Sequence, residues 1–440
     1  MKAQCILMGC GLLVVYSLFF TFSEGWNGQS RWALSLALAR RGTTAVDEFI
    51  GESRDVSVSG GRLYAAKAPG MGILGAPVVW LGDRIVAPGD PTGDAAKRLL
   101  VRVILVSVPA AMLAVLLCMA HTPSAALTAA ACCVASPVLP YATLFYGHVP
   151  SALCLMAAWM LAREKRHLWA GVVAGLGCAI DYLTALGIVG VVVLVALEDR
   201  RGAVRLVFGM LPGAALVAGY NLASFGTPLA TGYENLADEG FAEAMSHGYR
   251  GIGAPALRTL VPMLFGTYRG LFLLSPWLLL WPVAALKLRS RHELIMTVAV
   301  PVFYLVLLSG FPAWWGGASC TVRHAIIVLP LMAWAVGTLG GRWRRLLLVL
   351  AAMSWVAQIG FTATEPEMPE DVAFPLAHFV VPRILAGRFR GTVLGAGGIG
   401  QAVALALAVG FSWGVLIAAW RMRRELSPDS AARILSPADD

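Results

Sequence analysis

The sequence predicts an all-α polytopic membrane protein, and three observations support this class. The 440 residues are 58% hydrophobic and only 13% charged, and their mean hydropathy is +0.73. The apolar residues form runs of about 18 or more, long enough to cross a hydrocarbon layer of ~30 Å. No segment alternates apolar and polar residues as the strands of a membrane barrel do, so helices are the structures that satisfy the backbone in lipid.

Basic residues and cysteines exclude several other classes. The net charge of +9 does not indicate a nucleic-acid partner, because Lys and Arg occur in small clusters beside apolar runs. Seven of the eight cysteines fall within apolar runs, without Cys-x-x-Cys spacing, and Cys320 lies in a predicted external loop. The sequence therefore indicates neither a disulfide framework nor a zinc site or other metal site.

Twelve apolar runs predict twelve membrane helices, and the first is read as an uncleaved span because no small-residue cleavage site follows Phe22. The predicted spans are 5–22, 99–120, 124–142, 147–162, 168–181, 183–197, 204–222, 264–286, 293–310, 324–339, 345–362 and 397–420. Residues 71–86 are also apolar, but this segment is short, contains Pro77 and ends at Asp83 and Arg84.

The basic clusters decide how residues 71–86 are interpreted. If this segment lies along the membrane interface, the clusters at 163–166, 200–201, 287–291, 342–345 and 421–424 all face the cytoplasm. If it spans, all of them move outside. We therefore predict one integral domain (1–420) in a bacterial cytoplasmic membrane, with both termini and a tail (421–440) in the cytoplasm. The predicted external loops are 23–98, 223–263, 311–323 and 363–396.

The long first loop, 23–98, is polar and carries several carboxylates. Residues 30–41 predict a short helix on the membrane surface, with Ser30 as its N-cap and Gly42 as its end. An acidic stretch follows, and a Ser-Gly-Gly turn at 59–61 leads to Tyr64, Lys67 and Pro69. Carboxylates directly after an apolar span indicate a segment in water, so this loop is where we expect the chemistry.

These features resemble the GT-C integral membrane glycosyltransferases, in particular the lipid-linked-sugar enzymes related to protein O-mannosyltransferases and aminoarabinose transferases. The likeness rests on the acidic first loop with its surface helix, and on the Tyr-x-x-Lys-x-Pro element at 64–69. Shorter matches to an uncharacterised bacterial branch lie at 145–148, 220–233, 269–276 and 315–324. The chain departs from the pattern in two places. It has Glu24 alone where such enzymes usually carry an Asp-Glu pair, and Ala66 where an acidic residue often precedes the lysine.

The resemblance implies transfer of a sugar from a polyprenyl-phosphate donor to a glycan, lipid or protein acceptor on the outer membrane face. It implies no required cofactor and leaves a divalent cation open. One alternative is a twelve-helix transporter or lipid flippase, and another is a catalytically lapsed GT-C relative. The absence of a repeat between the two halves, and the single long acidic loop, favour the enzyme.

Such a transfer needs a carboxylate that accepts the acceptor proton and cations that stabilise the leaving phosphate. The candidate bases are Asp47, Asp55 and Glu24, in that order, because Val46 and Phe49 flank Asp47 with apolar anchors. The structural alternative for each is a solvated loop acid.

Lys67 leads the candidates for donor phosphate binding, since it lies at the predicted interface, where it could instead only anchor the chain. Arg323 stands at an outer span end, against the positive-inside trend. The full phosphate-binding set is Lys67, Arg323, His324 and Arg31, and the residues expected to line the cleft are Tyr64, Tyr146, His148, Asp181 and Trp315. Asp181 lies between two apolar runs, so it is expected to be paired or to face a cavity.

Overall fold

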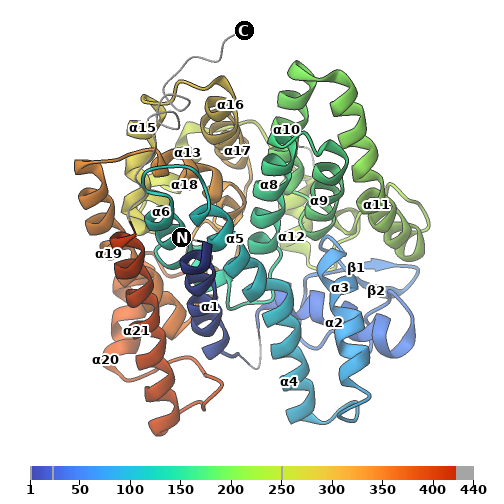
Figure 1. Ribbon diagram of the computed structural model, residues 1–440. Coiled ribbons are helices and arrows are strands. Elements are labelled where there is room, and N and C mark those ends of the chain that lie inside the picture. The colour runs from blue at the N-terminus through green and yellow to red at the C-terminus, as the bar shows by residue number, and fades with distance from the viewer. Residues whose placement is uncertain (1, 22–23, 249–250, 423–440) are drawn as a thin grey trace.

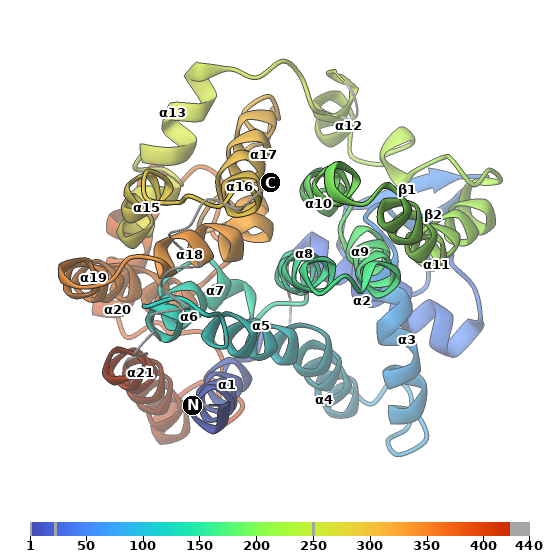
Figure 2. The same cartoon turned by 45° about the horizontal axis from the view of Figure 1, so that its top comes forward.

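The predicted membrane helices are present in the computed structural model, which describes residues 2–21, 24–248 and 251–422. Each predicted span coincides with a helix or with consecutive helices in the bundle shown in Figures 1 and 2. They are α1 (Lys2–Leu18), α4 (Pro91–Arg102) with η1 (Val103–Ser107) and α5 (Val108–Cys118), α6 (Ala125–Val134) with α7 (Val138–Tyr141), α8 (His148–Arg163), α9 (His167–Ile180), α10 (Thr184–Glu198), α11 (Arg200–Phe225), η3 (Pro276–Leu279) with α15 (Leu280–Ala285), α16 (Arg291–Leu294) with η4 (Ile295–Ala299) and α17 (Val300–Leu308), η5 (Arg323–Val328) with α18 (Leu329–Gly337), α19 (Arg342–Thr364) and α21 (Gly398–Arg421).

Within the described residues, five of these helical segments are long and apolar enough to cross a membrane by length and composition. They are Pro91–Cys118, Arg200–Phe225, Arg291–Leu308, Arg342–Thr364 and Gly398–Arg421. Two of the other predicted spans are interrupted, because Pro137 lies between α6 and α7 and Pro276 begins η3. The fold class, an all-α polytopic membrane protein, is confirmed. The predicted tail lies almost wholly outside the described residues.

Short helices and one hairpin make up the rest of the described chain. They are α2 (Trp26–Arg41), β1 (Val56–Ser59), β2 (Arg62–Ala65), α3 (Gly70–Gly82), η2 (Gly232–Glu234), α12 (Glu239–Ser246), α13 (Leu257–Phe265), α14 (Leu271–Leu274), η6 (Leu376–Val380) and α20 (Val381–Leu385). In Figure 1, α2, α3 and the hairpin lie together on one side of the bundle.

The helix predicted at 30–41 is longer and more buried than expected. It begins at Trp26, so Ser30 lies inside the helix and the N-cap assigned to it is wrong. The helix ends as predicted, at Gly42, whose φ is 64°. The N–H of Gly42 donates to the Leu38 carbonyl at 3.2 Å, and the N–H of Thr43 donates to the Ala37 carbonyl at 3.4 Å. Ten of its sixteen residues are buried. We conclude that α2 packs into the protein and does not merely rest on its surface.

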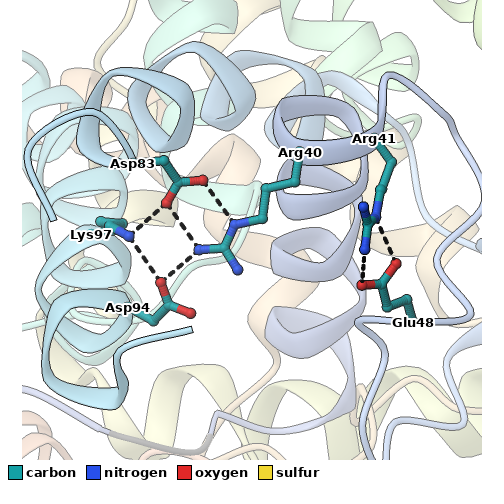
Figure 3. A network of polar contacts seen from close by, with 6 residues as sticks. All are labelled: Arg40, Arg41, Glu48, Asp83, Asp94 and Lys97. Carbon is teal, nitrogen blue, oxygen red and sulfur yellow. Dashed lines mark hydrogen bonds and ion pairs between the residues drawn. The ribbon is translucent and has the colours of Figure 1, made fainter. Parts of the chain in front are cut away.

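Helix α3 has thirteen residues and rises about 20 Å, less than the ~30 Å needed to cross the hydrocarbon. The interfacial placement of residues 71–86 stays a prediction. An ion-pair network joins the end of α3 to α2 and α4 (Figure 3). Asp83 lies 2.8 Å from Arg40 and 2.5 Å from Lys97, and Asp94 lies 2.6 Å from Arg40 and 3.0 Å from Lys97.

We expect Asp83→Asn to lower the stability of the protein by about 1–3 kcal/mol, because it leaves two largely buried cations short of a charged acceptor. The exposed pair of Arg41 and Glu48, also in Figure 3, provides the control, since Glu48→Gln is expected to cost about 0–1 kcal/mol. Thermal unfolding of the two purified variants in the same detergent measures the difference. Equal midpoints would show that the network does not stabilise the loop.

Helices α9 and α11 cross closely, and this contact fixes the end of α9 near the site. A side chain in place of Gly171 would overlap the backbone at Leu206, and one in place of Gly213 would overlap the backbone of Gly175. Glycines four residues apart, at 171 and 175 and at 209 and 213, permit this approach of two membrane helices.

One expectation about cysteines is wrong. The structure pairs Cys5 of α1 with Cys118 of α5 in a disulfide, with a Cα–Cα distance of 5.7 Å. The two residues are 113 positions apart, so sequence spacing carries no sign of the pairing. The other six cysteines are free.

Candidate active site

The hairpin brings a carboxylate, Asp55, and an ammonium group, Lys67, together. In the antiparallel register Val56 pairs with Ala65, so the residue before β1 and the residues after β2 meet at one end. These residues include Asp55 and Lys67, whose Oδ1 and Nζ atoms are 3.1 Å apart. Both side chains are buried, with relative exposures of 7% and 9%. The turn at the other end uses two glycines with positive φ, at 60 and 61.

Lys67 lies in an aromatic and cationic environment. Its ammonium lies 5.1 Å from the ring centroid of Tyr233 and 4.5 Å from that of Phe241. Burial lowers the pKa of Lys67, Asp55 acts against this, and the nearby charges of Arg323 and Arg31 lower it further. Three cations from separate parts of the chain therefore act on one another in this region.

Arg31 belongs to the buried face of α2. Its Nε donates to Asn27 Oδ1, one helical turn earlier, at 2.9 Å. Its Nη1 donates to the carbonyl of Ile180, at the end of α9, at 3.2 Å. The guanidinium is thus held between the first loop and the membrane helices.

Arg323 begins η5, and the preceding glycine loop packs on it. Its Nη1 donates to the Tyr146 hydroxyl at 3.2 Å, and its guanidinium lies 5.1 Å from the centre of the Tyr146 ring. Its Nε is buried and has no hydrogen-bond partner among the described residues. Gly316 has a φ of 85°, and a Cβ there would lie 2.9 Å from that Nε. The loop therefore needs glycine in order to cover Arg323.

Two histidines complete this region. His148 Nδ1 lies 2.7 Å from Asp181 Oδ2, so the intramembrane acid is paired, as the sequence led us to expect. The rings of His148 and His324 are edge to face, with centroids 5.1 Å apart. Within the described part of the chain, His148 Nε2 and His324 Nδ1 are buried without hydrogen-bond partners. Both nitrogens, like Arg323 Nε, could bond to a bound ligand.

A pair of buried carboxylates, Glu24 and Glu367, contacts the segment of Phe145 and Tyr146. Glu24 Oε2 accepts from the backbone N–H of Phe145 at 3.0 Å. Glu367, from the loop after α19, accepts from the N–H of Gly25 at 2.7 Å and from the Tyr146 hydroxyl at 2.5 Å. A Cβ at Gly25 would overlap Glu367, and one at Gly28 would overlap Glu24. Burial, followed by the charge of Glu24, raises the pKa of Glu367 to about 7.

Two buried arginines fix the segment that carries Glu24. Arg102 donates to the carbonyls of Tyr16 and Phe19, at 2.7 and 2.8 Å, and so satisfies the end of α1. Arg390 donates to Thr143 Oγ1 and to the Thr143 carbonyl, at 2.6 and 2.9 Å, beside the backbone that binds Glu24. Both arginines therefore hold backbone segments that neighbour Glu24.

The structure brings most of the predicted site residues together. These are Asp55, Glu24, Lys67, Arg323, His324, Arg31, Tyr146, His148 and Asp181. Three others lie apart. Asp47 is 40% exposed, accepts from the N–H of Leu63 at 2.9 Å and lies 3.4 Å from Arg62, so it contacts strand β2 from outside the hairpin.

The other two residues, Tyr64 and Trp315, contact side chains outside this cluster. Tyr64 packs edge to face on Phe225, with ring centroids 5.6 Å apart. Trp315 donates to Glu370 Oε2 at 2.7 Å in the loop that precedes Arg323. Neither residue contacts Lys67 directly in the described contacts, so both are peripheral to the cluster.

Sequence reasoning missed Glu367 and Tyr233. Glu367 lies 343 positions after Glu24. It is one of four acids between residues 365 and 371, and no spacing links it to the first loop. Tyr233 is covered only by the short sequence match at 220–233. A metal centre has no support in the described residues, where no group of three His, Cys, Asp or Glu side chains could hold an ion.

An apolar groove of about 720 Å³ lies elsewhere, between α1 and α21. Leu7 and Gly11 of α1 line it together with Leu407 and Phe411 of α21. These residues of α1 lie toward its amino end, whereas Glu24 follows its carboxyl end. The groove is therefore separate from the polar cluster.

The chain shares its fold, a polytopic helical membrane architecture, with two solved structures, and both are of ArnT from Cupriavidus metallidurans. The structure bound to undecaprenyl phosphate has a TM-score of 0.53 and 15% identity, and the match covers 95% of this chain and 75% of ArnT. The apo structure has a TM-score of 0.51 and 18% identity, and the match covers 94% and 76%. Searches of protein-family models and of curated protein sequences found no match.

Proposed function

We propose that the protein is a membrane glycosyltransferase that takes a sugar from a polyprenyl-phosphate donor and transfers it to an acceptor on the outer face of a bacterial cytoplasmic membrane. The observation that carries this proposal is the convergence of Lys67, Arg31 and Arg323 in one buried region. The proposed orientation, with both termini in the cytoplasm, follows from the basic clusters.

A lipid phosphate fits the donors of this region. Arginine and lysine are the side chains that bind phosphate oxygens, and Arg323 Nε is buried without a partner among the described residues. An anion bound here would supply an acceptor to this N–H. One ArnT structure contains undecaprenyl phosphate, and the likeness in fold supports a donor of the same class for this chain.

The proposed reaction is a single displacement at the sugar. The acceptor oxygen forms a bond to the anomeric carbon and gives its proton to the base. The bond between that carbon and the phosphate oxygen breaks, and the electron pair stays on the phosphate. Lys67, Arg31 and Arg323 would stabilise the negative charge that develops there. The reaction is balanced without an oxidant or reductant.

Glu24 is the base that the geometry favours. Asp55 is held by Lys67 at 3.1 Å, so its contact with the cation is its clearest role. Asp47 is exposed, lies before the hairpin and contacts Arg62. Glu24 is buried near Glu367, and its Oε2 is held by the N–H of Phe145 at 3.0 Å. The order of candidates inferred from sequence is therefore reversed in this proposal.

The test that separates an enzyme from a carrier uses purified protein in liposomes with a radiolabelled polyprenyl-phosphate sugar and a bacterial envelope extract as the source of acceptor. We expect release of polyprenyl phosphate and transfer of label to the acceptor. Movement of intact donor across the bilayer without transfer would favour the flippase. Donor binding with neither transfer nor movement would favour a catalytically lapsed protein.

A further inference from the structure

We infer that Glu367 is a positioning residue for Arg323 and the charge partner of Glu24, so that binding of the anionic donor is accompanied by uptake of a proton at the carboxylate pair. This inference rests on the proposed donor site. It assigns a role to a loop far along the chain, after α19, that the proposed transfer does not by itself require.

A continuous set of hydrogen bonds links Glu367 to the cations. The Tyr146 hydroxyl donates to Glu367 Oε1 at 2.5 Å and accepts from Arg323 Nη1 at 3.2 Å. The hydroxyl has one proton, so its donation to Glu367 leaves its lone pairs for the guanidinium. Glu367 therefore determines how Tyr146 presents its oxygen to Arg323, and with it the direction in which Arg323 points.

A second set of bonds fixes the two carboxylates against each other. Glu367 binds the N–H of Gly25, the residue after Glu24, and Glu24 binds the N–H of Phe145, the residue before Tyr146. Glu367 is thus held by the residue next to Glu24, and Glu24 is held by the residue next to Tyr146, which is itself a partner of Glu367. Glu24 and Glu367 cannot separate without breaking these bonds, so their charges stay coupled.

Other charged and titratable groups face Glu367 from each neighbouring segment. They are Glu24 after α1, Tyr141 of α7, Tyr146 before α8, Arg323 of η5, Glu365 of the same loop and Arg390 before α21. Glu24 and Glu365 favour the protonated form of Glu367, whereas Arg323, Arg390 and the bond from Tyr146 favour the ionised form.

The sign of the coupling follows from this arrangement. With its pKa raised to about 7, Glu367 is partly ionised near neutral pH. A phosphate bound at Arg323 adds a negative charge and engages the guanidinium that stabilises ionised Glu367. The pKa of Glu367 should then rise further, so that a proton is taken up. By linkage, donor affinity should fall as the pH rises through about 7.

Binding of a short polyprenyl methyl phosphodiester tests the inference, because this probe carries one constant charge, whereas a phosphate monoester titrates with a second pKa of about 6. We expect the wild-type dissociation constant to be roughly 3 to 10 times larger at about pH 8 than at about pH 6, since each pKa unit of coupling corresponds to a factor of about ten. Calorimetry in two buffers of different ionisation enthalpy should show proton uptake at about pH 7.

Three variants distinguish the role of Glu367 from binding at the donor site. Glu367→Gln keeps acceptor and size, and should bind the probe with little pH dependence and no proton uptake. Glu370→Gln, in the same loop but bonded to Trp315, should behave as the wild type. Tyr146→Phe, which breaks the link to Arg323, should weaken binding at every pH.

Two results would count against the inference, and they differ in what else they affect. If the Glu367→Gln variant binds the probe with the same pH dependence and proton uptake as the wild type, the role of Glu367 is overturned. The donor site is then left intact. Failure of the wild type to bind the probe at any pH would remove the donor site as well.

Discussion

Lys67→Ala is expected to reduce sugar transfer by roughly 10²-fold or more, because preorganised charge at a leaving group is usually worth about that much when removed. Lys67 is the buried ammonium of the proposed phosphate site, with Arg323 and Arg31 acting on it. Lys67→Arg, which keeps the charge but changes its shape, should fall between the wild type and Lys67→Ala. Steady-state transfer with saturating acceptor measures the effect.

Two controls separate loss of the phosphate contact from damage to the fold. Lys67→Ala leaves Asp55 buried without its cation, so the double variant Lys67→Ala, Asp55→Asn should be more stable than the single variant but equally inactive. Arg62→Ala removes an exposed cation from the same hairpin and should retain activity. Near wild-type transfer by Lys67→Ala would reduce Lys67 to an anchor of the interfacial segment.

Glu24→Gln is expected to lower transfer by roughly 10²- to 10⁴-fold, the usual contribution of a general base, while donor binding persists. Glutamine keeps the size of the side chain and an oxygen that accepts from Phe145, but it cannot take the acceptor proton. The variant should therefore lose turnover and keep its affinity for a polyprenyl phosphodiester.

The other acids of the first loop provide matched comparisons. Asp47→Asn should have almost no effect on transfer, because Asp47 is exposed and its described contacts are only to Arg62 and Leu63 of β2. Asp55→Asn should have an intermediate effect through Lys67. A full loss in Asp47→Asn together with full activity in Glu24→Gln would restore the order that the sequence suggested.

Local patterns predicted the membrane helices, and long-range contacts decided the site. Apolar runs located α11 and α19 to within four residues at each end, because a helix in lipid must satisfy its backbone within itself. The pairing of Asp55 with Lys67 follows from a hairpin whose turn was recognised but whose strands were not. Asp47 and Asp55 looked alike in sequence, and only the packing of the loop separates an exposed acid from a buried one.

Contacts between segments far apart in the chain could not be predicted from a single sequence. Glu367 reaches Gly25 across 342 positions, and Cys5 reaches Cys118 across 113. The start of α2 was misplaced because Ser30 is a common N-cap residue, whereas the buried helix extends four residues earlier. Each miss reflects tertiary packing that overrides a local preference.

An experimental structure of the purified protein with polyprenyl phosphate bound tests the central claim most directly. We predict that the phosphate lies within hydrogen-bonding distance of Lys67, Arg31 and Arg323, close to Glu24. A phosphate bound away from all three cations, for example at the groove between α1 and α21, would contradict the proposed donor site.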